Sequence, residues 1–248
     1  MTAPHVLVLQ HIACEPPGVY EDVLRERGVR LHRVELDEGE PLPGWEEFDA
    51  IVSMGGPMGA YDGEEHPWLR DEQRLLREAV AADVPVFGAC LGSQQLAAAL
   101  GAEVWRADAP EVGVLDVELT PAGREDPVLG ALPARFPTLQ WHGDTFALPQ
   151  GATLLASSPA FAHQAFRVGR SYGIQFHLEV TGAMAQEWAA VPAYAASLAA
   201  TRGPGALDRL LADFAARREE MQAHARTLFA AWWEVATGAT GAAVSAAG

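Results

Sequence analysis

The chain of 248 residues contains no lysine, because all 17 of its basic residues are arginine. This absence excludes three kinds of site that depend on a lysine side chain: a Walker A phosphate loop, a Schiff-base centre and a kinase-type strand lysine. Only two cysteines are present, Cys14 and Cys90. Two cysteines predict neither a disulfide framework nor a structural zinc site. We therefore expect no metal and no cofactor.

Long hydrophobic runs and an excess of positive charge are also missing. No apolar run approaches the ~18 residues of a membrane span, and the segment 6–9 is too short for a signal peptide. The formal net charge of −16 argues against nucleic acid or an anionic membrane as the main partner, because phosphate binding needs clustered cations. These features predict a cytoplasmic protein that binds neither nucleic acid nor membrane.

The first hundred residues alternate short apolar strands with helices. Strands are predicted over 5–9, 29–36 and 48–54, with a fourth beginning at 84, and helices over 19–27, 67–82 and 91–100. This alternation is typical of a doubly wound α/β sheet. In such sheets the ligand crevice lies beyond the carboxyl ends of the strands. Functional side chains are therefore expected directly after strands.

Beyond Gly101 the pattern changes to short strands, predicted over 112–119, 136–141, 153–156, 164–167 and 172–176, which extend the sheet in mixed orientation. Residues 183–200 are predicted to be helical. After a break at 203–205, one long helix or two shorter ones run to about residue 235, followed by a frayed tail over 237–248. We expect residues 1–200 to form one domain and 201–248 a helical extension packed on it.

Cys90 lies between a strand and a helix, in the frame Gly88-Ala89-Cys90-Leu91-Gly92. This frame is typical of a nucleophile elbow, a turn so sharp that glycines are needed beside the nucleophile. The helix that follows supplies free N–H groups and a positive dipole end, which favour a thiolate and a neighbouring oxyanion. Cys14 lacks such a frame and is interpreted as an ordinary thiol.

A cysteine hydrolase also needs a histidine base and an acceptor that orients the ring. Of the eight histidines, His177 is the best candidate, because it ends an apolar strand and Glu179 follows two residues later. The period of two along an extended backbone places both side chains on the same side. The alternative is a histidine at a strand end beside a surface glutamate.

Four segments together resemble the class I (triad) glutamine amidotransferase family: Gly55-Gly56-Pro57, residues 88–94, Trp141-His142-Gly143-Asp144 and residues 175–179. The likeness covers about residues 6–180 and is greatest to stand-alone members related to the amidotransferase domain of GMP synthase. It implies a flavodoxin-like α/β fold with a mixed, mostly parallel sheet flanked by helices. The family usually has His-Pro-Glu where this chain has His177-Leu178-Glu179, which implies some loss of local rigidity.

The resemblance also implies roles for individual residues. Cys90 would be the nucleophile, His177 the base and Glu179 the residue that orients the base. The backbone N–H groups of Gly56 and Leu91 would form the oxyanion hole. The implied substrate-binding residues are Gly55, Gln94, His142 and Asp144.

Some of these positions have alternatives. Gln94 lies one helical turn below Cys90; the alternative is a side chain that only solvates the helix, but the apolar residues 96–99 predict a buried helix. His142 is a rival for the base, although the motif context favours His177. Tyr61 and Asp62, just after the glycine loop, are candidates for closing over the pocket.

Three functions remain open at this point. The first is a glutamine amidotransferase that hydrolyses the side-chain amide of glutamine and releases ammonia for a separate ATP-dependent synthetase, because the chain shows no ATP-binding motif of its own. The second is a self-sufficient γ-glutamyl hydrolase or peptidase that uses the same residues. The third is a silent binding module, which the presence of Cys90, His177 and Glu179 together disfavours.

Overall fold

The computed structural model describes residues 3–238; the predicted frayed tail lies outside them from residue 239 onward. The strands are β1 His5–Gln10, β2 Arg30–Glu35, β3 Ala50–Ser53, β4 Val86–Ala89, β5 Val104–Leu119, β6 Arg135–Phe146, β7 Thr153–Ser157, β8 Ala165–Val168 and β9 Ser171–Ile174. The helices are α1 Val19–Glu26, α2 Trp68–Ala81, α3 Leu91–Ala99, α4 Pro121–Glu125, α5 Gly182–Ala190, α6 Pro192–Arg202 and α7 Ala206–Thr237.

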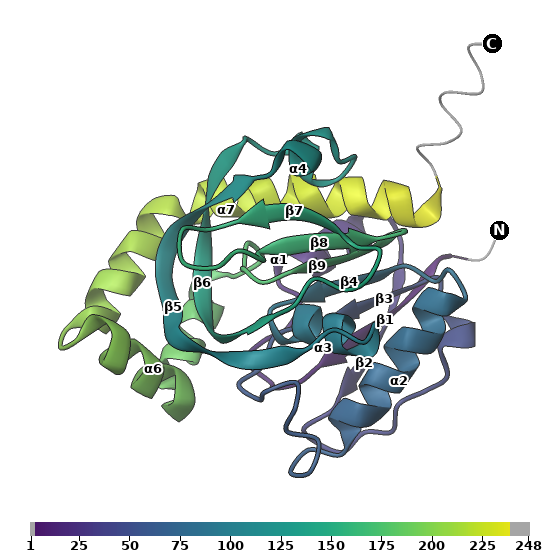
Figure 1. The fold of residues 1–248 in the computed structure, drawn as a ribbon, viewed down its shortest axis with the longest axis horizontal. Helices are drawn as coiled ribbons and strands as arrows, with labels where there is room; N and C mark the ends of the chain where they lie inside the picture. The colour runs from purple at the N-terminus through teal and green to yellow at the C-terminus, as the bar shows by residue number, and fades with distance from the viewer. Residues whose placement is uncertain (1–2, 239–248) are drawn as a thin grey trace.

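All nine described strands join one sheet in the order β2-β1-β3-β4-β9-β8-β7-β5-β6 (Figure 1). The first five run parallel to one another, and the remaining four each run antiparallel to their neighbours. The parallel part has the flavodoxin-like order 2-1-3-4-5, with β9 as its fifth strand. The predicted α/β class and the mixed sheet orientation are therefore confirmed.

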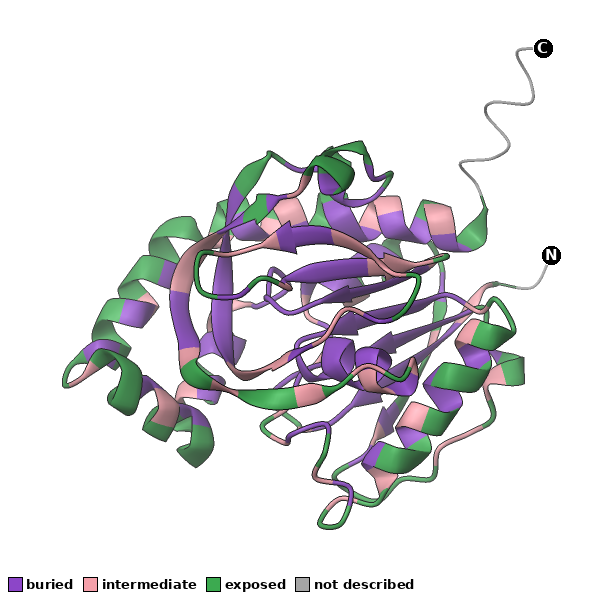
Figure 2. Ribbon diagram, viewed as in Figure 1, coloured by how far each residue is buried: buried purple, intermediate pink, exposed green. Residues whose placement is uncertain are grey.

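Helices cover both faces of the parallel strands, which explains why the four central residues of β1, Val6 to Leu9, are all apolar. Val6 and Val8 belong to the same core cluster as residues of α1 and α7. Leu7 and Leu9 belong to a second cluster with residues of α2 and α3. Successive side chains of a strand point to opposite faces, so a strand covered on both sides needs apolar residues at every position. The central strands are accordingly buried, while the outer faces of the helices are exposed (Figure 2).

The antiparallel strands bring β6 back toward the end of β9. The backbone of His177, just after β9, exchanges hydrogen bonds of 2.9 and 3.0 Å with the backbone of Leu139 in β6. The Gln175 N–H also donates to the Gln164 carbonyl at 2.8 Å. Backbone hydrogen bonds thus hold the segment that carries His177 on both sides.

The helix predicted over 183–200 is two helices, α5 and α6, which meet at Val191. Pro192 is the cause, because proline lacks a backbone N–H and disfavours helical geometry at the residue before it. The predicted domain boundary at residue 200 falls inside α6, and the division into a domain and an extension stays a prediction.

After Gly203–Gly205 the chain forms the single long helix α7, which lies along the sheet (Figure 1). Its Phe229 ring stacks on Tyr20 of α1 at 4.5 Å and meets Phe87 of β4 edge-on at 5.1 Å. Within residues 3–238, no helix has the length and apolar character needed to cross a membrane.

Candidate active site

Cys90 occupies a strained turn at the carboxyl end of β4. Its φ of +51° is one of two positive values among the described non-glycine residues, and such strain is found mainly at functional sites. The turn is tight enough that a Cβ on Gly92 would overlap the Ser53 carbonyl, and one on Gly88 would overlap the Gly92 carbonyl. The Cys90 N–H donates to the Ile174 carbonyl at 2.8 Å. The elbow is therefore fixed directly to the end of β9.

His177 and Glu179 form a buried pair beside this turn. Nδ1 of His177 donates to Oε1 of Glu179 at 2.7 Å, and both side chains are 1% exposed. The other oxygen, Oε2, accepts the backbone N–H of Leu178 at 3.0 Å. Trp188 of α5 packs edge-on against the His177 ring at 4.6 Å. The second ring nitrogen of His177 is left to face Cys90.

The pKa values of Cys90 and His177 reflect burial and their mutual charges. Burial alone lowers the pKa of His177, but the charges of Glu179 and Cys90 outweigh it and raise this pKa well above 6.5. Burial raises the pKa of the Cys90 thiol, and His177 and the Leu91 N–H act in the opposite direction. The charge of His177 thus favours the thiolate and that of Glu179 the imidazolium, while burial and the charge of Glu15 leave the pKa of Cys90 raised.

The glycine loop after β3 lies opposite the elbow. Gly55 is buried, and a Cβ there would overlap the Glu15 carboxylate and lie 3.1 Å from Cε1 of His177. A Cβ on Gly56 would lie 2.9 Å from Cβ of His11 and 3.0 Å from Cδ2 of Leu91. Among residues 3–238, the Gly56 N–H has no hydrogen-bond acceptor. It is a free donor beside Cys90.

A cavity of about 560 Å³ opens over Cys90, within the usual size of small-molecule sites. Its walls come from the glycine loop, the elbow, β5, β6 and α6. The lining residues include Gly56, Met58, Cys90, Gln94, Arg106, Asp108, Trp141, His142, Asp144, Tyr194 and Ser197. Of the predicted site residues, Gly56, Cys90, Gln94, His142 and Asp144 line this cavity. Gly55, Leu91, His177 and Glu179 are buried behind its wall.

Gln94 lines this cavity but its amide is already engaged. Its Nε2 donates to Oε1 of Gln175 at 3.1 Å, and Nε2 of Gln175 donates to Sγ of Cys90 at 3.6 Å. The two amides therefore form a chain that ends on the thiol. Gln175 lies in the strand-end segment noted in the sequence, but only the fold shows that its side chain turns toward Cys90.

His142 and Asp144 lie on β6 at the far side of the cavity. Nε2 of His142 lies 3.2 Å from Oε2 of Glu111, and its Nδ1 lies 2.9 Å from the Asp144 carbonyl. With both ring nitrogens engaged away from Cys90, His142 is poorly placed as a base. Burial raises the pKa of Asp144, although Tyr61 and Arg106 oppose it.

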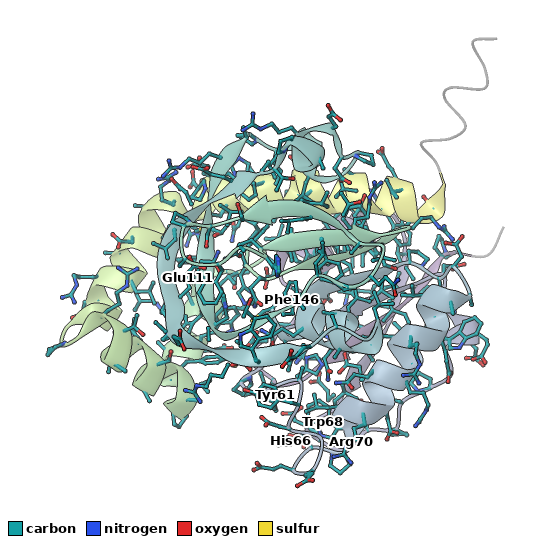
Figure 3. All side chains as sticks on the ribbon, in the orientation of Figure 1. Tyr61, His66, Trp68, Arg70, Glu111 and Phe146 are labelled. Atoms are coloured by element: carbon teal, nitrogen blue, oxygen red, sulfur yellow. The ribbon has the colours of Figure 1, made fainter. Side chains whose placement is uncertain are left out.

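Tyr61, on the loop before α2 (Figure 3), is a neighbour of Asp144. Burial and the charge of Asp144 raise the pKa of Tyr61 to about 12. Asp62 instead accepts the Gly59 N–H at 2.7 Å. Neither Tyr61, which is half exposed, nor Asp62 is among the residues that line the cavity.

Glu15 is a buried carboxylate that sequence reasoning missed. It is 2% exposed, lies against Gly55 and accepts a hydrogen bond from the Tyr194 hydroxyl of α6. Burial raises the pKa of Glu15, while His177 and Tyr194 oppose this effect. Its position in the loop that follows β1, which ends at Gln10, was the available signal, since that edge of the sheet carries ligand sites.

The described residues contain no cluster of three or more histidine, cysteine or acidic side chains suited to a metal. The chemistry available in the cavity is that of a cysteine beside a histidine and a carboxylate.

Several known proteins are similar to this chain in sequence or in fold. The chain is 36% identical over 176 residues to the glutamine amidotransferase-like protein YfeJ of Salmonella typhimurium, covering 69% of this chain and 74% of that protein. It is 37% identical over 163 residues to GMP synthase (glutamine-hydrolyzing) of Aeropyrum pernix, which covers 63% of this chain and only 29% of the synthase. The crystal structure of a glutamine amidotransferase from Thermotoga maritima superposes with a TM-score of 0.83 at 32% identity, covering 94% of this chain and 99% of that one.

A model of the protein family described as "Glutamine amidotransferase class-I" matches residues 19–188. This span includes Cys90, His177, Glu179 and the glycine loop, and it is more than half of the chain. The chain therefore belongs to the class I glutamine amidotransferase family.

Proposed function

We propose that the protein hydrolyses the side-chain amide of glutamine at Cys90 and releases ammonia for a separate synthetase. The observation that carries this proposal is that three features meet at Cys90: its strained elbow, the buried His177–Glu179 pair behind it, and Gly56, whose N–H is free and which lines the same cavity as Cys90. Together these features supply a nucleophile, a base with a fixed orientation and a donor for an oxyanion. The Aeropyrum pernix relative is named a glutamine-hydrolyzing GMP synthase, and this name agrees with the proposed chemistry.

In the first half of the proposed reaction, His177 accepts the Cys90 proton and Sγ attacks the amide carbon. The carbonyl oxygen becomes an oxyanion between the N–H groups of Gly56 and Leu91. The C–N bond then breaks, and the amide nitrogen takes the proton from His177 and leaves as ammonia. A γ-glutamyl thioester remains on Cys90. Throughout, Glu179 holds the His177 ring and stabilises its positive charge.

In the second half, His177 removes a proton from a water molecule that attacks the thioester carbon. A second oxyanion forms in the same place and collapses, which breaks the C–S bond. The proton on His177 returns to the Cys90 sulfur, and glutamate leaves. Each step uses only side chains and backbone N–H groups of this chain, the substrate and one water molecule.

The far side of the cavity is suited to the amino-acid end of the substrate. We propose that Asp144 pairs with the ammonium group and that Arg106, which also lines the cavity, pairs with the α-carboxylate. Gln94, His142 and the Gly55 backbone complete the wall in this proposal.

The second candidate is a self-sufficient γ-glutamyl hydrolase that acts on larger γ-glutamyl amides or peptides. The size of the cavity supports this second candidate, because a volume of about 560 Å³ is in the range that holds drug-sized ligands. The thioester chemistry would be the same, and only the leaving group would differ. For both candidates we propose a cytoplasmic protein, since Cys14 and Cys90 are free thiols, as is usual in a reducing compartment.

Turnover of glutamine and of a panel of γ-glutamyl amines and peptides separates the two candidates. We expect measurable glutaminase activity that rises when the partner synthetase is added. Rapid cleavage of one γ-glutamyl amine or peptide, with slow turnover of glutamine, would instead select the hydrolase.

A covalent probe tests the chemistry common to both candidates. The glutamine analogue diazo-oxo-norleucine should label Cys90 in the wild type and leave Cys90→Ala unlabelled. Inert wild-type protein that matches Cys90→Ala in every assay would select the silent binding module.

A further inference from the structure

A buried polar network lies behind the glycine loop, outside the cavity. Nε2 of His11 is 2.9 Å from Oε2 of Glu72, and the same carboxylate accepts Oγ of Ser53 at 2.6 Å and Nε2 of Gln95 at 3.0 Å. All four residues are fully buried. They come from the end of β1, from β3, α2 and α3, so the network joins the elements that surround the loop.

His11 is held between two hydrogen-bond acceptors. Its Nδ1 lies 3.2 Å from the Gly55 carbonyl, opposite the contact to Glu72. A neutral ring has one N–H, so only the doubly protonated ring donates to both partners. Burial lowers the pKa of His11, but Glu72 and the Gly55 carbonyl outweigh it and leave the pKa raised. Trp68, at the start of α2 (Figure 3), stacks on the ring at 5.6 Å.

The bond to Gly55 determines which way the next N–H points. The described chain has no cis peptide bond, and in a planar trans peptide the C=O and the following N–H point in opposite directions. Since the Gly55 carbonyl faces His11, the Gly56 N–H faces away from it. Gly56 lines the cavity together with Cys90, and its N–H is the free donor described above.

The loop needs such a restraint because its two glycines impose little conformational preference of their own. Side chains cannot supply it, because a Cβ on Gly55 would overlap Glu15 and one on Gly56 would crowd His11. A charged donor on the carbonyl also polarises the peptide, which strengthens the N–H at its other end as a donor.

We propose that His11, held by Glu72, is a positioning residue that orients the Gly55–Gly56 peptide so that the Gly56 N–H faces the oxyanion formed at Cys90. The inference rests on the proposed acyl-transfer function. It assigns the buried network a task in catalysis although none of its members touches the substrate.

Two substitutions separate the two bonds of His11. In His11→Asn the amide nitrogen takes the place of Nδ1 and still donates to Gly55. In His11→Gln the amide nitrogen takes the place of Nε2, which keeps the contact to Glu72 and loses the donor to Gly55. Ser53 and Gln95 continue to bind Glu72 in both variants.

The experiment compares turnover of glutamine and γ-glutamyl-p-nitroanilide with alkylation of Cys90 by iodoacetamide. Alkylation needs the thiolate but forms no oxyanion. We expect His11→Gln to lower kcat about ten- to a hundredfold, somewhat less than the loss of an oxyanion donor itself, with KM and the alkylation rate near wild type. His11→Asn should retain most of kcat.

Equal kcat values for the two variants would overturn the inference, as would a parallel loss of turnover and alkylation, which would mean that His11 supports the whole site. If the wild type turned over neither substrate, the proposed function would fail and this inference with it. A wild type that is active and matched by His11→Gln would overturn only the inference.

Discussion

The backbone N–H of Leu178 donates a hydrogen bond of 3.0 Å to Oε2 of Glu179. The other oxygen of this carboxylate accepts a hydrogen bond of 2.7 Å from Nδ1 of His177. Both carboxylate oxygens of Glu179 therefore accept a hydrogen bond. A proline at position 178, as the family resemblance suggests, could not donate this bond. The chain thus replaces the rigidity of a proline ring with a hydrogen bond.

The first prediction concerns this bond. Leu178→Pro should lower the free energy of unfolding by about 1.5–3 kcal/mol, because the carboxylate loses a charge-assisted hydrogen bond, and it should also lower kcat. Leu178→Met is the matched control, since it keeps the N–H and nearly the same buried volume. Urea unfolding and steady-state kinetics measure both effects. Identical kcat values for the two variants would show that the Leu178 bond does not position Glu179.

The second prediction ranks the catalytic substitutions. Glu179→Ala should retain more activity than His177→Ala, because water partly replaces an orienting carboxylate but nothing replaces the base. In a serine-protease triad the corresponding difference is roughly 50- to 100-fold in kcat. The backbone bonds to Leu139 and the packing of Trp188 should keep the ring in place. Equal and complete losses in the two variants would contradict these roles.

The third prediction is a shift with pH. Glu179 raises the pKa of His177, so Glu179→Gln should lower it, and the limb of the pH profile of kcat/KM that reports His177 should move to lower pH. The other charged groups near the ring are Cys90 and Glu15, which the substitution leaves unchanged. The profile of wild type and variant over the accessible pH range is the measurement. A limb that stays in place or moves to higher pH would refute the assignment.

The fourth prediction concerns Tyr194 and Glu15. Tyr194→Phe removes the hydroxyl that donates to the buried Glu15 carboxylate and should destabilise the protein by about 1–3 kcal/mol at neutral pH. Burial raises the pKa of Glu15 above its ordinary value of 4.5, and losing the donor raises it further. The destabilisation should therefore be small while Glu15 is protonated, below its raised pKa in the folded protein. It should grow as the pH rises through that pKa and Glu15 ionises.

Chemical unfolding at several pH values, with Glu15→Gln as a background that cannot ionise, measures this effect. In that background, Tyr194→Phe should show no such dependence on pH. A destabilisation independent of pH in the wild-type background would mean that the hydroxyl does not act through the Glu15 charge.

The fifth prediction tests how α7 belongs to the fold. Phe229→Ala should lower the free energy of unfolding by about 3–5 kcal/mol, because the ring is fully buried between Tyr20 and Phe87. Glu219→Ala, on the exposed side of the same helix, should stay within about 0.5 kcal/mol of wild type. A single unfolding transition that shifts in Phe229→Ala would place α7 in one cooperative unit with the sheet. Two separate transitions would support an independent extension.

Local patterns in the sequence were enough to predict the elements that carry Cys90 and His177. The glycines around Cys90 predict the elbow because only a residue without a side chain fits there, as the overlap between a Gly92 Cβ and Ser53 shows. The spacing of His177 and Glu179 predicts their shared face, and the observed 2.7 Å contact agrees. Strand and helix periodicity likewise predicts the alternating first half of the chain.

Other features depended on contacts between residues far apart in the sequence. Nothing local links Glu15 to Tyr194, or His11 to Glu72, because these pairs meet only when β1, α2 and α6 pack around the same edge of the sheet. From the sequence, either one long helix or two shorter ones were possible after Gly205. The structure has a single helix, α7, and its Phe229 and Trp232 are buried in the same core cluster as residues of the sheet. Residue types and spacing thus determined which groups are predicted to carry the proposed chemistry. The tertiary structure decided which buried partners hold them, because hydrogen bonds and packing act through space and not along the chain.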